Sequence, residues 1–232
     1  MSELISGRFM AIHERLAHAA LAYNRNPRDI TLLAVSKTYD HTAVCAAART
    51  GQRDFGENYL QEALEKQKAI ANPDLVWHFI GPIQGNKTRG IAENFAWAHG
   101  VDRLRIAERL SAQRPDSMPP LNLCLEVNVS GEASKSGALP DTLVELAEQV
   151  AALPRLRLRG LMAIPAPTSD PVQQRSAFCQ VRSLFNTLNA CGLDLDTLSM
   201  GMSGDFESAI AEGSTMVRIG TAIFGARTYA AH

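Results

Sequence analysis

The feature that most constrains the fold is a repeated alternation of short, continuous apolar runs with longer helix-like stretches. The first run is Thr31–Val35, in which residues 32–35 are all apolar. Unbroken hydrophobicity is typical of a strand that is buried on both faces, and such strands belong to parallel sheets. Seven further strands are predicted at 54–56, 76–80, 95–98, 121–127, 158–164, 197–200 and 216–224.

Helix-like stretches separate these runs. An amphipathic helix is predicted near the N-terminus, with apolar residues mostly three or four positions apart between Leu4 and Tyr23. The later helices are predicted at 42–49, 58–70, 87–93, 103–113, 141–152, 171–188 and 206–211. Eight strand–helix units in 232 residues correspond to about 29 residues per unit, close to the usual value for a TIM barrel.

The pattern predicts an α/β fold, a single (β/α)8 TIM barrel over residues 1–232, in which residues 1–28 form a helix that leads into the barrel. A doubly wound open sheet is the structural alternative, because alternation alone does not establish that a sheet closes.

Charge and composition exclude several classes of protein. Hydrophobic residues make up 46% of the chain, and 23 basic residues face 24 acidic ones. This balance argues against a dedicated nucleic-acid binder and against a polybasic membrane binder. The N-terminus lacks the pattern of a signal peptide. We therefore expect a soluble, cytoplasmic protein with no nucleic-acid or membrane partner.

The cysteine spacing is also typical of a cytoplasmic protein. The four cysteines form no CxxC pair, and we expect no metal site and reduced, mostly buried thiols at Cys45, Cys124, Cys179 and Cys191.

Lys37 is the most informative polar residue. It follows the first predicted strand, and active sites of such barrels lie at the carboxyl ends of the strands. A partly desolvated lysine has a lowered pKa, which makes its amine a nucleophile toward carbonyl groups. The alternative is a lysine whose ammonium group reaches out to water.

Two short motifs follow the seventh and eighth strands, where such barrels usually bind phosphate. They are Ser203-Gly204 and Gly220-Thr221. Glycine lets backbone N–H groups approach an anion, and the hydroxyls add further donors. Taken singly, each motif could be an ordinary turn, but their joint placement favours a phosphate site.

Arg218 lies inside an apolar strand, between Val217 and Ile219. A buried guanidinium needs partners, so a structural salt bridge and a donor to a ligand are both open. Together, Lys37, the two glycine motifs and Arg218 predict a site for pyridoxal 5'-phosphate (PLP). They would supply an amine, a phosphate cradle and a partner for the ring nitrogen, respectively.

Other polar residues favour structural roles. His78 and His99 lie in or beside predicted strands and are expected to be core histidines with satisfied hydrogen bonds. Lys135 lies in a Gly/Ser-rich loop, as a solvated charge or part of a mobile lid.

Five motifs resemble those of the pyridoxal phosphate homeostasis protein family. They are Leu33-Ala-Val-Ser-Lys37, Phe55-Gly-Glu-Asn-Tyr59, His78-Phe-Ile-Gly81 with Gln84-Gly-Asn-Lys87, Ser199-Met-Gly-Met-Ser203, and Val217-Arg-Ile-Gly-Thr221 through Phe224-Gly225. They occur in the family's order over nearly the whole chain. The resemblance implies a lone (β/α)8 barrel similar to the N-terminal domain of alanine racemase and to eukaryotic ornithine decarboxylase.

The resemblance also implies roles for individual residues. Lys37 stands where the family forms its internal aldimine with PLP, and Arg218 where an arginine faces the pyridine nitrogen. Asn58 lies in the motif beside the ring, and the phosphate is held at the positions of Ser203, Gly220 and Thr221. Tyr39-Asp40 matches its segment of the family only loosely.

The implied function is that of a monomeric protein that carries, buffers or delivers PLP without catalytic turnover, with PLP-dependent apo-enzymes as candidate recipients. An arginine cannot lend its proton to the ring nitrogen, which weakens the cofactor as an electron sink. Two alternatives remain: a single-domain, PLP-dependent amino-acid racemase or lyase that uses Lys37 as a base, and a barrel that binds a phosphate metabolite without a cofactor.

Overall fold

The eight strands of the barrel are parallel and follow one another around it in chain order. A computed structural model describes residues 2–130 and 136–225. The strands are β1 (Thr31–Val35), β2 (Asp54–Glu57), β3 (Val76–Phe79), β4 (Trp97–Val101), β5 (Leu121–Glu126), β6 (Leu156–Met162), β7 (Thr197–Ser199) and β8 (Met216–Ile219). The sheet closes because β1 pairs with β8, from Thr31 opposite Met216 to Ala34 opposite Ile219. The prediction of a (β/α)8 barrel is confirmed.

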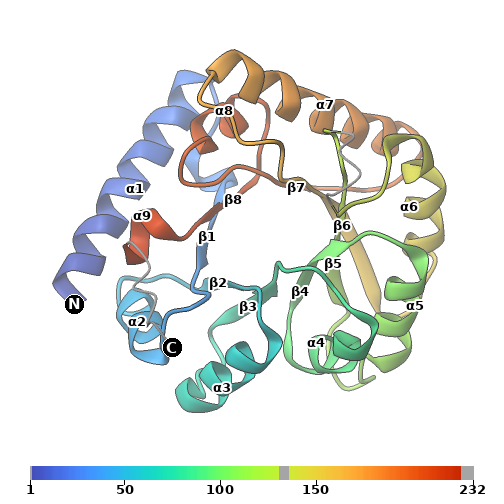
Figure 1. The fold of residues 1–232 in the computed structure, drawn as a ribbon, viewed down its shortest axis with the longest axis horizontal. Coiled ribbons are helices and arrows are strands. Elements are labelled where there is room, and N and C mark those ends of the chain that lie inside the picture. The colour runs from blue at the N-terminus through green and yellow to red at the C-terminus, as the bar shows by residue number, and fades with distance from the viewer. Residues whose placement is uncertain (1, 131–135, 226–232) are drawn as a thin grey trace.

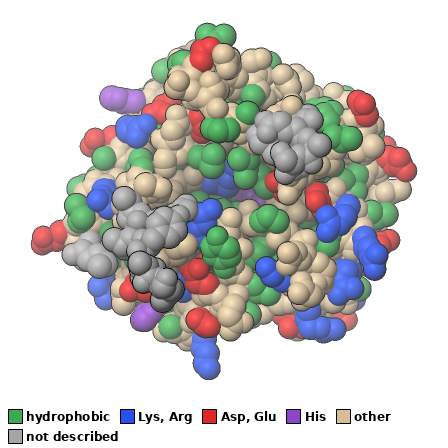
Figure 2. Space-filling model, viewed as in Figure 1, with side chains coloured by type: hydrophobic (Ala, Val, Ile, Leu, Met, Phe, Trp, Pro, Cys, Tyr) green, Lys and Arg blue, Asp and Glu red, His purple; other side chains and the backbone are tan. Residues whose placement is uncertain are grey.

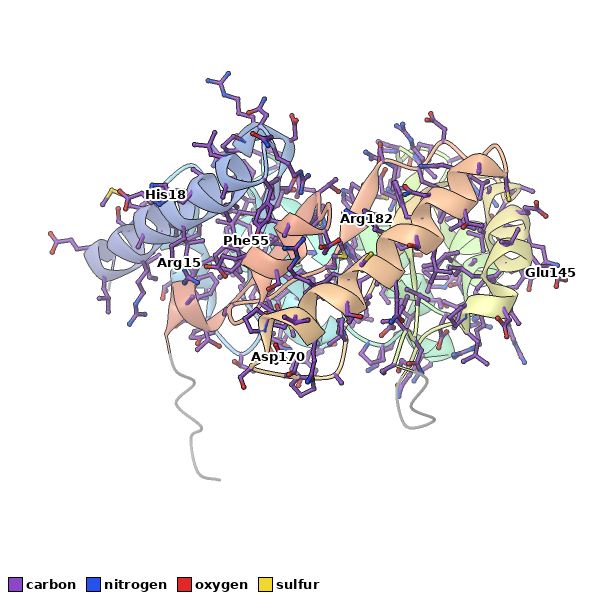
Figure 3. The ribbon with its side chains drawn as sticks, turned by 90° about the horizontal axis from the view of Figure 1, so that it is seen from above. Arg15, His18, Phe55, Glu145, Asp170 and Arg182 are labelled. Carbon is purple, nitrogen blue, oxygen red and sulfur yellow. The ribbon has the colours of Figure 1, made fainter. Side chains whose placement is uncertain are left out.

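Helices form the outer ring, as Figure 1 shows. They are α1 (Ser2–Ala22), α2 (His41–Ala48), α3 (Leu60–Ile70), α4 (Thr88–Asn94), α5 (Leu104–Gln113), α6 (Leu143–Ala151), α7 (Pro171–Ala190), α8 (Phe206–Ala211) and α9 (Thr221–Phe224). Short 3-10 turns lie at Pro27–Asp29, Gly85–Lys87 and Pro140–Thr142. In the side view of Figure 3, α1 and α7 lie along the outside of the barrel and carry the labelled Arg15 and Arg182.

The start of α7 follows from its sequence. Pro171 occupies the first turn, where a missing N–H costs no hydrogen bond. The side chain of Asp170 accepts a hydrogen bond from the Val172 N–H, which caps one of the free donors of the first turn.

Apolar side chains form two clusters. The larger one lies between the sheet and the helices and includes Phe55, which is labelled in Figure 3. The smaller one consists of side chains from several strands, Leu33, Trp97, Cys124, Met162 and Met216. The strands also carry buried polar side chains, above all those of His78, His99 and Arg218, which distinguish this barrel from a purely apolar one.

The strand predicted over 216–224 is the main error in the elements. β8 ends at Ile219, and residues 221–224 form the short helix α9. An apolar run of this length does not distinguish a strand from a buried helical turn, and Gly220 separates the two here. β4 and β6 are also shifted, by two to three residues and by two residues, from the predicted ranges.

The cysteine prediction was partly wrong. Cys124 is buried, Cys45 and Cys179 are half-buried, and Cys191 is exposed at the end of α7. Within residues 2–130 and 136–225, no helix combines the length and the hydropathy needed to cross a membrane.

Candidate functional site

A cavity of about 260 Å³ opens at the carboxyl ends of the strands. All six residues predicted to bind the cofactor line it: Lys37, Asn58, Ser203, Arg218, Gly220 and Thr221. The other lining residues are Val35, Tyr39, Ile80, Ile164, Met202 and Gly204. Figure 2 shows basic side-chain atoms at the centre of this face, surrounded by hydrophobic ones. The cavity therefore joins polar groups from opposite ends of the sequence beside apolar side chains.

Lys37 is held by the hydrogen bonds of its two neighbours. Ser36 is buried, and its hydroxyl donates to Glu57 Oε1 over 2.6 Å. Thr38 has a φ of +70°, which is uncommon for a residue other than glycine. Its backbone N–H donates to Glu62 Oε1 over 2.6 Å. The backbone is thus anchored on both sides of Lys37.

Lys66 on α3 joins these anchors into one buried network. Its ammonium group donates to the Ser36 carbonyl and to Glu57 Oε1, each over 2.7 Å, and to Glu62. Burial raises the pKa of the Glu57 carboxyl, and the Lys66 ammonium and the Ser36 hydroxyl oppose that rise. Sequence reasoning missed this network, although Glu62 and Lys66 stand at the i, i+4 spacing of a helical ion pair.

Arg218 combines a structural role with a position at the cavity. Its Nη1 donates to the Ser199 hydroxyl over 3.0 Å and to the Ser199 carbonyl, and its Nη2 donates to the Ala163 carbonyl over 3.0 Å. Desolvation lowers the pKa of the guanidinium to about 10, so it stays protonated at neutral pH. Since a guanidinium has five N–H groups, its Nε–H and one Nη2–H are not used in these bonds among the described residues and could donate to a ligand.

The glycine motifs meet on one side of the cavity. Ser203 and Gly204 precede α8, and Gly220 and Thr221 lie at the junction of β8 and α9. A Cβ atom at Gly220 would lie 3.1 Å from the Val35 carbonyl oxygen, so the backbone of β1 approaches closely there. These turns offer hydroxyl and backbone N–H donors, the groups that bind an anion.

Asn58 and Glu126 extend the polar lining. The Oδ1 atom of Asn58 is buried and has no hydrogen-bond partner among the described residues. Asn58 also lines a second cavity of about 320 Å³, which shares Ile80 and Ile164 with the first and contains Glu126. Burial raises the pKa of the Glu126 carboxyl to about 7, and nearby Asp102 adds to the rise.

The remaining candidates take structural positions. His78 and His99 are buried in the barrel and hydrogen-bonded, as predicted. Lys135 lies outside the described residues. In the part of the chain that the structure describes, no group of three or more His, Cys, Asp or Glu side chains is arranged to hold a metal ion.

Comparisons with known proteins identify relatives of this chain. Residues 13–228 match the family model for the alanine racemase N-terminal domain. The chain is 63% identical over 217 residues to the pyridoxal phosphate homeostasis protein of Pseudomonas aeruginosa, covering 94% of this chain and 93% of that one. It is 54% identical over 221 residues to the protein of the same name from Escherichia coli K12, covering 94% of both.

Solved structures of two other proteins superpose on this barrel. PipY of Synechococcus elongatus with PLP bound superposes with a TM-score of 0.83 and 36% identity, over 95% of this chain and 100% of that one. Alanine racemase from Corynebacterium glutamicum gives a TM-score of 0.72 at 18% identity, over all of this chain and 63% of that one, and shows the shared barrel fold.

Proposed function

The chain belongs to the family of pyridoxal phosphate homeostasis proteins, and we propose that it binds PLP and carries or buffers it. The observation that supports this most directly is the convergence of the Lys37 amine, the Arg218 guanidinium and the glycine motifs on one cavity. The names of the relatives describe PLP homeostasis and not an enzymatic reaction.

The residues present fit PLP, which has an aldehyde, a flat aromatic ring and a phosphate. Lys37 would hold the aldehyde carbon, and Arg218 would donate to the ring nitrogen. The hydroxyls and backbone N–H groups of Ser203, Gly220 and Thr221 would hold the phosphate. Asn58, whose buried Oδ1 has no partner among the described residues, would contact the ring substituents.

Bound PLP supplies an aldehyde for reversible covalent attachment to an amine and a ring that accepts electrons. The residues of this chain favour the first property over the second. Because Arg218 would donate a hydrogen bond without giving up its proton, the ring nitrogen would stay unprotonated. Ile80 and Ile164 would give the ring apolar neighbours. This arrangement would hold the cofactor and would weaken it as an electron sink for carbanion chemistry.

We expect the protein to act as a cytoplasmic monomer, because the cavity already holds the amine, the guanidinium and the hydroxyls assigned to PLP. PLP-dependent apo-enzymes are the proposed recipients of the cofactor.

The experiment is reductive trapping. Purified protein incubated with PLP should show a visible absorption band, and borohydride should then fix the cofactor on the peptide that contains Lys37. Lys37→Ala should lose both signals. Lys68→Ala, at an exposed lysine of α3, should keep both. Absence of the band and of the trapped peptide in the wild-type protein would refute the proposal.

A second measurement separates binding from turnover. A racemase or lyase must exchange the proton on the α-carbon of its substrate, so deuterium from solvent would enter an amino acid. We expect incorporation no faster than with free PLP. Faster incorporation that Lys37→Ala abolishes would identify an enzyme.

A further inference from the structure

A line of hydrogen-bonded side chains crosses the interior of the barrel. It starts at Asp54, on the first residue of β2, and runs through His78 on β3 and His99 on β4. It continues through Ser199, the last residue of β7, to Arg218 on β8. It therefore connects the end of the barrel remote from the cavity with a residue that lines the cavity.

Each contact has hydrogen-bonding geometry. Asp54 Oδ1 lies 3.0 Å from His78 Nε2, and His78 Nδ1 lies 3.1 Å from His99 Nε2. His99 Nδ1 lies 2.9 Å from the Ser199 hydroxyl, which lies 3.0 Å from Arg218 Nη1. The side chains of His78, His99 and Ser199 are fully buried, whereas that of Asp54 is 30% exposed.

The Asp54 end sets the direction of every bond when both rings are neutral. An ionised carboxylate can only accept, so His78 Nε2–H donates to Asp54. His78 Nδ1 then accepts from His99 Nε2–H, and His99 Nδ1 accepts from the Ser199 hydroxyl. Arginine can only donate, so Ser199 accepts from Arg218. Both neutral rings carry their proton on Nε2.

The surroundings favour these neutral rings. Burial lowers the pKa of His78 and, together with the nearby titratable His78 ring and the charge of Arg218, lowers that of His99 well below 6.5. His78 stacks on Trp97, which also contacts the His99 ring and lies 4.8 Å from the Arg159 guanidinium. The acids near Arg218 are Asp205 and Glu126. Asp54 is the acid that faces the histidine pair.

We propose that Asp54, His78 and His99 are positioning residues for Arg218, which fix its guanidinium through Ser199 so that the remaining N–H groups face the cofactor ring. This inference rests on the proposed function, because Arg218 is assigned there to the ring nitrogen. Without these hydrogen-bonded side chains, Ser199 could rotate its hydroxyl, and one of the hydrogen bonds that orient Arg218 would weaken.

The first test reads the ring protons without any cofactor. Long-range 15N–1H NMR spectra of the cofactor-free protein at pH 7 should show both His78 and His99 with the proton on Nε2. Asp54→Ala should mix the two tautomers of His78. Asp54→Asn, which keeps an acceptor in place, should restore the Nε2 proton. Asp116→Ala removes an exposed partner of Arg155 and should change neither ring.

The second test measures release of PLP. Asp54→Ala should release PLP roughly ten-fold faster, the size of effect typical for groups that orient a binding residue, and Asp54→Asn should return the rate to within about two-fold of wild type. His99→Leu should match Asp54→Ala, and His99→Asn, whose amide oxygen can accept from Ser199, should recover most of the loss. If His99→Leu does not fold, the Asp54 series decides alone.

The outcomes are distinct. Three results would overturn the positioning role of the hydrogen-bonded side chains. They are a proton on Nδ1 of either ring, a charged ring at pH 7, and a rate of PLP release from Asp54→Ala equal to that of wild type. A wild-type protein that binds no PLP overturns the proposed function instead.

Discussion

Lys37 owes its position to residues that do not line the cavity. Glu62 holds the Thr38 N–H, and Lys66 holds the Ser36 carbonyl and pairs with the fully buried Glu57. Such a pair is costly to break because one partner is left as an uncompensated buried charge.

Lys66→Met should therefore lower the free energy of unfolding by about 3–5 kcal/mol. The double variant Glu57→Gln/Lys66→Met should recover part of this loss, because it leaves no buried carboxylate at position 57. Lys68→Met, at an exposed position of the same helix, should have almost no effect. Urea unfolding of the cofactor-free proteins measures all three, and a K66M protein as stable as wild type would contradict the assigned role.

Glu126 should make stability depend on pH. Its pKa of about 7 in the folded protein lies above its ordinary value of 4.5, so the folded state binds more protons than the unfolded state between these values. The free energy of unfolding therefore falls as pH rises from about 4.5 to about 7. The full shift corresponds to about 3 kcal/mol at most.

Glu126→Gln should remove this dependence. Its stability advantage over wild type should grow as pH rises through this window and level off above pH 7. Urea unfolding at pH 5 and pH 8 measures the advantage. Glu145→Gln changes an exposed glutamate of α6, labelled in Figure 3, and should show no such difference. An equal advantage for E126Q at both pH values would show that the pKa of Glu126 is not raised.

At the scale of elements, the pairing of β5 with β6 contains a bulge. Leu123 lies opposite Leu158, but Cys124 lies opposite Gly160, so Arg159 is left without a partner in the ladder. Its side chain pairs with Asp196 and donates to Asn122. Gly160 then runs so close to β7 that a Cβ atom would lie 1.8 Å from the Thr197 carbonyl oxygen.

Gly160→Ala should therefore destabilise the barrel by about 3 kcal/mol or more, because the backbone of β7 must move. Gly7→Ala is the matched control, since a Cβ atom there meets nothing within 4 Å. As a change within a helix it should stabilise by about 1 kcal/mol at most. Thermal unfolding compares the two variants, and a G160A protein with the wild-type midpoint would contradict the close approach.

For the whole molecule, the consequence of closure is that residues from both ends of the sequence line one cavity. Pairing of β8 with β1 brings Arg218, Gly220 and Thr221 beside Lys37. Helix α1 contacts α8 and α9 from the outside, which supports the turns that carry Ser203 and Gly220.

A monomer should follow from this arrangement. Sedimentation equilibrium should give a mass near 25.2 kDa with and without PLP, because this chain already supplies the amine, the guanidinium and the hydroxyls assigned to PLP. A dimer that dissociates when PLP is removed would contradict the expectation.

Much of the fold and of the candidate site could be predicted from the sequence alone, because the relevant signals are local. Continuous apolar runs mark buried parallel strands, and the polar residues that follow each run lie at the carboxyl end of the barrel. Lys37 could be selected in this way, Arg218 because it lies inside an apolar strand, and Asn58 through the resemblance to the family. The structure places all three at one cavity.

Only the tertiary structure decided what depends on contacts between distant segments. Closure of the sheet rests on the pairing of β1 with β8, and the hydrogen bond between His99 and Ser199 joins residues 100 positions apart. The helical turn of α9 and the Lys66 network likewise depend on packing against other elements. A pattern along the chain records which residues are buried, whereas the partner of a buried polar group is set by the register and the closure of the barrel.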